Sequence, residues 1–159
     1  LMAYYLEREL DELAREGVQL RLIGDHKAFG PQLVERLERA VERTAQNDRL
    51  VLVVALNYGS RDEIAGAAKR LAEKAVTGEL DPAAISEASL AAELSTHDLP
   101  DLDLVIRTSG EKRLSNFLLW QAAYAGLIFV DALWPDFGEQ EFEAALTEFA
   151  GRQRRFGGR

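Results

Sequence analysis

Two arginines and a serine lie close together in the segment 107–115, which reads RTSGEKRLS. The guanidinium groups of Arg107 and Arg113 offer forked N–H donors that match phosphate oxygens. Ser115 precedes an apolar segment and could cap a helix there, and the free N–H groups of a first helical turn carry positive partial charge. A diphosphate has several oxygens to satisfy and fits this density of donors, so the spacing predicts an anion site.

A structural explanation of the same residues stays open. Arg107 and Arg113 could instead pair with Glu111 and with other acids, while Ser115 serves only as the N-cap of the following helix. Both explanations are consistent with the local sequence.

The elements that must position this segment alternate between strand and helix patterns. The apolar spacing predicts strands at 18–22, 50–56, 104–106 and 127–130, and helices at 2–13, 31–47, 64–75, 89–94, 116–125 and 142–149. This alternation predicts an α/β fold with a mainly parallel central sheet flanked by helices. The length of 159 residues, 47% of them apolar, predicts a single domain over residues 1–159. Because residues 50–56 are apolar throughout, we expect that strand at the sheet centre, buried on both faces.

Ligands of open parallel sheets bind beyond the carboxyl ends of the strands, so the residues that follow each strand are the place to search. Four such exits can be identified, at residues 24–25, 57–62, 107–113 and 131–136. The second exit could contribute Asn57 and Arg61 to a site. An ordinary strand-to-helix turn, with Asp62 and Glu63 favouring the helix N-terminus, explains it equally well.

Other candidate residues have simpler explanations. His26 and His97 have no partner at metal-ligand spacing, which favours a structural role. Three aromatic residues at helical spacing indicate core packing: Phe117, Trp120 and Tyr124. The basic tail at 152–159 supplies cations to a helix C-terminus, or else forms an arm that reaches a phosphate on a partner subunit.

Composition excludes several classes of function. The chain has 19 Lys and Arg against 27 Asp and Glu, and a net charge of −8 argues against nucleic-acid binding. Cysteine is absent, so there is neither a disulfide framework nor a thiolate site, and we expect a cytoplasmic protein. The apolar runs are too short to cross a bilayer. A generic nucleotide-binding domain is disfavoured because neither G-x-G-x-x-G nor a Walker loop occurs.

Four sequence blocks are more specific together than any one of them alone. They read NYGSRDEI at 57–64, DLVIRTSGEKRLSNFLLWQ at 103–121, LWPDF at 133–137 and RRFGG at 154–158. In content and order they resemble the signature blocks of cis-prenyltransferases of the undecaprenyl diphosphate synthase family. The resemblance covers essentially the whole chain.

This resemblance implies a function. The family condenses isopentenyl diphosphate with an allylic diphosphate, such as farnesyl diphosphate, in cis, using Mg²⁺ in the hydrophobic tunnel of a homodimer. The product would be a polyprenyl diphosphate, a lipid carrier precursor, whose delivery implies peripheral membrane contact. Four residues would hold the isopentenyl diphosphate: Arg107, Arg113, Ser115 and, through its backbone, Leu114. In the tail, Arg155 and Gly157 would support a diphosphate across the dimer interface.

The chain departs from the family pattern in two ways. A Met-Asp-Gly-Asn-Gly-Arg-Trp block with the essential aspartate, and a Phe-Ser-x-Glu-Asn-Trp block, have no counterpart and are expected upstream of Leu1. We therefore expect an N-terminally incomplete domain that is inactive alone. The family's magnesium-ligating glutamate is replaced by Gly126, which offers no side-chain oxygen to a hard cation.

Two functional hypotheses follow from these departures. In the first, the parent protein is a prenyltransferase, as the intact set of Arg107, Arg113 and Ser115 indicates. In the second, it is a catalytically silent partner subunit of a prenyltransferase dimer, as Gly126 indicates.

Overall fold

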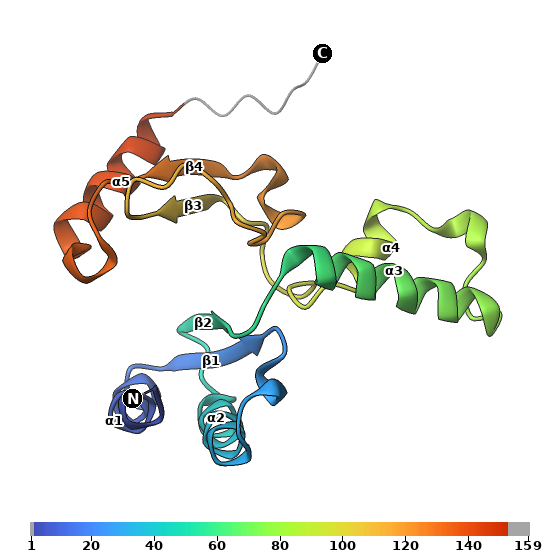
Figure 1. Cartoon of the computed structure of the whole chain (residues 1–159), viewed down its shortest axis with the longest axis horizontal. Helices are drawn as coiled ribbons and strands as arrows, with labels where there is room; N and C mark the ends of the chain where they lie inside the picture. The colour runs from blue at the N-terminus through green and yellow to red at the C-terminus, as the bar shows by residue number, and fades with distance from the viewer. Residues whose placement is uncertain (1, 153–159) are drawn as a thin grey trace. The chain divides into compact units, whose positions relative to one another are not determined.

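The computed structural model describes residues 2–152, with side chains described from Glu9 onward. The chain divides into two compact units, Leu1–His97 and Asp98–Arg159. Each unit combines helices with one pair of parallel strands (Figure 1). The predicted α/β class with parallel strands is therefore confirmed, although hydrogen bonds join the described strands in two pairs. The single domain over residues 1–159 stays a prediction.

The first unit begins with two helix–strand repeats. In chain order these are α1 (Met2–Arg15), β1 (Val18–Ile23), α2 (Pro31–Thr44) and β2 (Leu50–Ala55). The strands run parallel, with Val18 opposite Leu50 and Ile23 opposite Ala55. Helices α1 and α2 pack against each other and against β1 (Figure 1). All four elements lie where the apolar spacing predicts them.

The buried hydroxyl group of Thr44 joins two elements of this unit. Thr44 lies at the end of α2 and is fully buried. Its Oγ1 accepts a hydrogen bond from the Leu20 N–H at 3.0 Å and donates to the Ala40 carbonyl at 3.0 Å. Because buried donors are costly when left unpaired, this hydroxyl fixes α2 against β1.

The burial of β2 differs from the prediction. Leu50 is 57% exposed, and Val51 and Leu52 are each 39% exposed. Within the first unit, β2 is hydrogen-bonded to β1. A parallel strand is covered on both faces only when elements flank it on every side. The expected burial of residues 50–56 on both faces is therefore not met within this unit, and the central position of the strand stays a prediction.

The rest of the first unit is helical. Helix α3 (Ser60–Val76) packs against the short helix α4 (Glu87–Ala91), and both overlap the helices predicted at 64–75 and 89–94. Asp62 and Glu63 lie in the first turn of α3, where their charge complements the helix dipole.

The second unit contains β3 (Leu104–Arg107), β4 (Gly126–Phe129) and α5 (Glu139–Gly151). The two strands are parallel, with Leu104 opposite Gly126. Helix α5 packs against β4 (Figure 1), where Ile128 and Ala145 are buried. These three elements also confirm the sequence-based predictions.

The helix predicted at 116–125 is wrong over most of its length. Turns and bends occupy its first half, and only a 3₁₀ helix at Gln121–Tyr124 forms. Ser115, Asn116 and Leu118 have φ of 49°, 63° and 47°, outside the right-handed region that an α-helix requires. Two aromatic residues predicted to pack in the core are correspondingly exposed, Phe117 at 41% and Tyr124 at 80%.

A glycine at the end of β1 permits a close backbone approach. Gly24 has a φ of 88°, and a Cβ atom there would lie 2.3 Å from the Leu56 carbonyl oxygen and 2.9 Å from the Tyr58 Cα. Gly78 also has a positive φ, of 77°, but a Cβ atom there would meet nothing within 4 Å.

Alanine substitutions at the two glycines separate the cost of the left-handed conformation, which both share, from the cost of steric overlap, which only Gly24 has. We expect Gly24→Ala to lower the free energy of unfolding by about 3 kcal/mol or more, because backbone strain and steric overlap add. Gly78→Ala should cost about 1 kcal/mol, since only the left-handed conformation is penalised. Urea unfolding followed by circular dichroism measures both, and equal losses would contradict the close approach at Gly24.

Candidate functional site

The first two strand exits meet within the first unit. The Asp25 N–H donates to the Asn57 carbonyl at 3.3 Å, and the Asn57 Nδ2 donates to the Asp25 carbonyl at 3.4 Å. Asn57 takes a left-handed conformation, with φ of 47°, to make this turn. Parallel pairing of β1 and β2 thus brings both exits to one edge of the strand pair.

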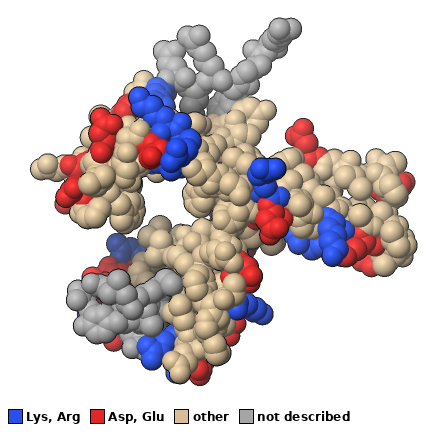
Figure 2. Space-filling view, in the orientation of Figure 1, with Lys and Arg blue, Asp and Glu red and all other residues tan. Residues whose placement is uncertain are grey.

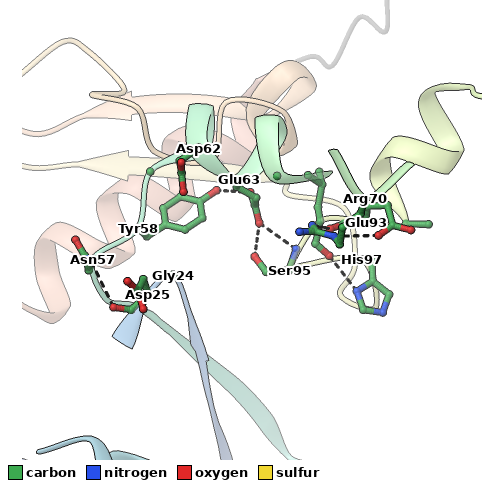
Figure 3. A pocket seen from close by; sticks show the side chains of 14 residues that line it. Gly24, Asp25, Asn57, Tyr58, Asp62, Glu63, Arg70, Glu93, Ser95 and His97 are labelled. Atoms are coloured by element: carbon green, nitrogen blue, oxygen red, sulfur yellow. Dashed lines mark hydrogen bonds and ion pairs between the residues drawn. The ribbon is translucent and has the colours of Figure 1, made fainter. Parts of the chain in front are cut away.

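A surface depression of about 660 Å³ lies beside these turns (Figure 3). Its lining comes from the two exits, from the start of α3 and from residues 92–97. Four carboxylates take part, from Asp25, Asp62, Glu63 and Glu93. The depression is therefore acid-rich.

Glu63 joins three parts of this lining (Figure 3). One carboxylate oxygen accepts a hydrogen bond from the Tyr58 hydroxyl at 2.6 Å, and the other accepts from the Ser95 N–H at 3.0 Å and from the Ser95 hydroxyl. The sequence predicts only a helix-terminal acid at this position. No local pattern signals a contact with a residue 32 positions further along the chain.

The arginine of the depression is already paired with an acid. Arg70 donates from Nε to the Glu93 carboxylate at 3.1 Å and from Nη2 to the Glu93 carbonyl at 2.5 Å. Lys74 also donates to this carboxylate. The hydrogen bond from Lys74, assisted by Arg70 and opposed by partial burial, lowers the pKa of Glu93. Because Arg70 is neutralised and acids surround it, the depression is a poor site for a phosphate.

The two histidines take part in local contacts. The His97 Nδ1 lies 3.0 Å from the Leu94 carbonyl oxygen, the structural role that the sequence favours. The His26 Nε2 lies 3.9 Å from a carboxylate oxygen of Glu38.

The third and fourth strand exits meet within the second unit. Beyond β3 and β4, the Val130 N–H donates to the Arg107 carbonyl at 2.8 Å. The Ser109 N–H donates to the Ala132 carbonyl at 2.8 Å, and the Gly110 N–H donates to the Val130 carbonyl at 3.0 Å. These hydrogen bonds fix the start of the 107–115 turn against the residues that follow β4.

The turn brings both predicted arginines together. Arg107, at the end of β3, donates from Nη1 to the Arg113 carbonyl oxygen at 2.6 Å. The Arg113 Nη2 lies 3.0 Å from a carboxylate oxygen of Glu111. The pairing that the alternative explanation expects is thus present for Arg113. Its side chain is nevertheless 66% exposed, so a ligand in solution can reach it.

The backbone around this turn is unusual. Four residues other than glycine have a positive φ here: Ser109, Ser115, Asn116 and Leu118. Because Ser115 is left-handed and exposed and no helix follows it directly, its predicted role as a helix cap is wrong. Residues in the left-handed conformation cost free energy and are enriched at functional loops. The backbone of this segment is therefore consistent with a binding role.

Gly126 occupies a crowded position at the start of β4. Its N–H donates to the Asp103 carbonyl at 2.8 Å, and a Cβ atom would lie 2.9 Å from the ring of Phe149 on α5. A side chain at position 126 would require the Phe149 ring to move. The sequence alone gives no sign of this contact. Among the side chains that the structure describes, from Glu9 to Arg152, no group of three or more His, Cys, Asp or Glu is placed to hold a metal ion. Position 126 itself does not fit a Mg²⁺ ligand, because glycine has no side-chain oxygen.

Two further expectations concern the tail and the surface. Arg155 and Gly157 lie outside the described residues. On the face drawn in Figure 2, acidic and basic side chains lie beside each other in several places and form no single basic field. In the described part of the chain, no helix has the length and apolar character needed to cross a membrane.

Comparisons with known proteins give a consistent result. A family model described as putative undecaprenyl diphosphate synthase matches residues 1–157. An isoprenyl transferase of Zymomonas mobilis is 54% identical over 99% of this chain and 64% of its own length. The (2E,6E)-farnesyl-diphosphate-specific ditrans,polycis-undecaprenyl-diphosphate synthase of Escherichia coli K12 is 50% identical over 99% of this chain and 62% of its own length. The chain thus spans less than two thirds of these curated relatives.

Two solved structures share the fold. Lavandulyl diphosphate synthase from Lavandula x intermedia, in complex with dimethylallyl diphosphate, matches 98% of this chain and 68% of its own, with a TM-score of 0.93 and 34% identity. A probable undecaprenyl diphosphate synthase from Campylobacter jejuni matches 99% of this chain and 71% of its own, with a TM-score of 0.85 and 35% identity. Together with the family model, these matches show that the chain belongs to the undecaprenyl diphosphate synthase family of prenyltransferases.

Proposed function

We propose that the whole protein condenses isopentenyl diphosphate with an allylic diphosphate, such as farnesyl diphosphate, in cis to form a polyprenyl diphosphate. We further propose that the 107–115 turn holds the diphosphate of isopentenyl diphosphate. The observation that carries this proposal is the meeting of Arg107 and Arg113 at one exposed turn beyond the end of β3. The curated relatives include a farnesyl-diphosphate-specific synthase, which supports the class of substrate.

The chemistry of the turn suits a diphosphate. Each guanidinium has five N–H donors, of which Arg107 uses Nη1 on the Arg113 carbonyl, leaving other donors for phosphate oxygens. The backbone N–H of Leu114 and the exposed hydroxyl of Ser115 would add two neutral donors within the same turn. Fixed cations next to a diphosphate stabilise its charge without reorganising during the reaction.

Binding at this turn would serve the condensation by alignment. The double bond of isopentenyl diphosphate attacks a carbon of the allylic substrate while the allylic diphosphate leaves, and a proton is then lost from the isopentenyl unit to form the new double bond. Both substrates must therefore be held in register. The solved relative in complex with dimethylallyl diphosphate supports an allylic diphosphate as the second substrate.

The remaining parts of the proposal concern the whole protein. We propose a homodimer in which Arg155 and Gly157 support a diphosphate across the interface, and a cytoplasmic location with peripheral membrane contact. Magnesium belongs to this proposal through the family, but no step is assigned to it, because Gly126 offers no ligand and the described residues hold no metal cluster.

A second candidate function rests on Gly126. A protein that lacks this carboxylate would keep the fold and the diphosphate turn while serving as the catalytically silent subunit of a prenyltransferase dimer. A Cβ atom at position 126 would lie 2.9 Å from the Phe149 ring, so the present packing leaves little room for a side chain, and this supports the alternative.

An elongation assay separates the two candidates. We expect the full-length protein, incubated with farnesyl diphosphate, labelled isopentenyl diphosphate and Mg²⁺, to form longer prenyl products that chromatography resolves. Gly126→Glu should be compared with Gly126→Ala, which displaces the Phe149 ring without adding a carboxylate. If the natural protein is inactive and only Gly126→Glu elongates the substrate, the silent-subunit function replaces the one proposed.

A binding measurement tests the turn itself. We expect Arg107→Ala in the full-length protein to weaken isopentenyl diphosphate binding by about 10- to 100-fold, as for the loss of a charged hydrogen bond. Arg39→Ala provides the control, because this exposed arginine on α2 pairs with Glu35 in the same helix and lies in the other unit. Unchanged binding by Arg107→Ala in calorimetry would contradict the assignment.

A further inference from the structure

We infer that Glu111 is a built-in competitor for the diphosphate, pairing with Arg113 until the ligand displaces it. The inference rests on the proposed diphosphate role of the 107–115 turn and adds to it a residue that limits the affinity of that turn.

The geometry places the competitor inside the site. The Glu111 carboxylate lies 3.0 Å from the Arg113 Nη2, and the two side chains are 42% and 66% exposed. Only one residue, Lys112, separates them in the sequence, so the carboxylate stays close to Arg113 whatever the ligand does. A diphosphate that binds Arg113 must therefore take over a donor that Glu111 already uses, and must tolerate a fixed negative charge beside it.

The two arginines of the turn consequently have different roles in binding an anion. Arg107 contacts the backbone carbonyl of Arg113, a neutral acceptor that holds the shape of the turn and does not neutralise the guanidinium charge. Arg113 contacts a carboxylate, which does neutralise it. The charge of Arg107 is thus available to a first encounter with an anion, whereas that of Arg113 becomes available only by exchange.

The exchange is energetically accessible. Ion pairs between exposed side chains are weak, because water screens them and both side chains lose freedom in the pair. A diphosphate offers more acceptor oxygens and more negative charge than one carboxylate. It therefore displaces the Glu111 carboxylate from the Arg113 guanidinium. The cost of this exchange, together with repulsion between Glu111 and the bound ligand, lowers the affinity below what the turn could reach.

The test uses the full-length protein and calorimetry with inorganic diphosphate and, separately, isopentenyl diphosphate, both without metal. We expect Glu111→Gln, which keeps the size of the side chain, to tighten binding of both ligands about two- to fivefold, the range that corresponds to an exposed ion pair. Glu143→Gln is the matched control, because it removes the same charge from an exposed position on α5. It should leave the affinity unchanged.

A double-mutant cycle separates competition from a general effect on folding or charge. Arg113→Gln should weaken binding, and in that background Glu111→Gln should no longer tighten it to the same degree, because the pair that it breaks is already gone. A purely structural role of Glu111 would give the same change in both backgrounds.

Three results would overturn the competitor role of Glu111. Unchanged or weaker binding by Glu111→Gln, with the natural protein binding normally, overturns the inference and leaves the proposed function intact. Equal tightening by Glu111→Gln and Glu143→Gln also overturns it, because the effect would then belong to net charge. If the natural protein binds neither ligand, the proposed function of the turn fails, and the inference fails with it.

Discussion

Parallel strand pairing is the constraint on which the candidate sites depend. In each unit, two parallel strands end at the same edge, so the residues that follow them meet although they are distant in the sequence. In the second unit the pairing continues beyond the strands, through the hydrogen bond from the Val130 N–H to the Arg107 carbonyl. This bond fixes where the turn begins. The contact of Arg107 with the Arg113 carbonyl then shapes the turn, in which the Arg113 side chain is exposed and Arg107 is half-buried.

Most of the fold could be predicted from local sequence patterns. Regular apolar spacing determines which face of an element is buried, so the strands, α2, α3 and α5 lie close to their predicted positions. The segment 116–125 shows where this reasoning stops. Its apolar spacing is that of a helix, but left-handed residues at 115, 116 and 118 interrupt the backbone, and φ is not encoded in apolar spacing. Burial of β2 likewise depends on neighbours rather than on its own residues.

In the candidate sites, contacts within one turn were predictable from the sequence and contacts between distant residues were not. The approach of Arg107 to Arg113 was predictable, since both follow one strand within a short turn. The link from Glu63 to Ser95 spans 32 residues, and the approach of Phe149 to Gly126 depends on how α5 packs against β4. Such contacts arise from packing, for which a single sequence carries no local signal.

We propose that isopentenyl diphosphate binds at the 107–115 turn and not at the acidic depression of the first unit. Hydrogen exchange of backbone amides, measured on the full-length protein with and without isopentenyl diphosphate, tests this choice most directly. We expect slower exchange at residues 107–118 on binding, with little change at residues 57–63 and 92–97. Slower exchange at the depression, with none at the turn, would contradict it.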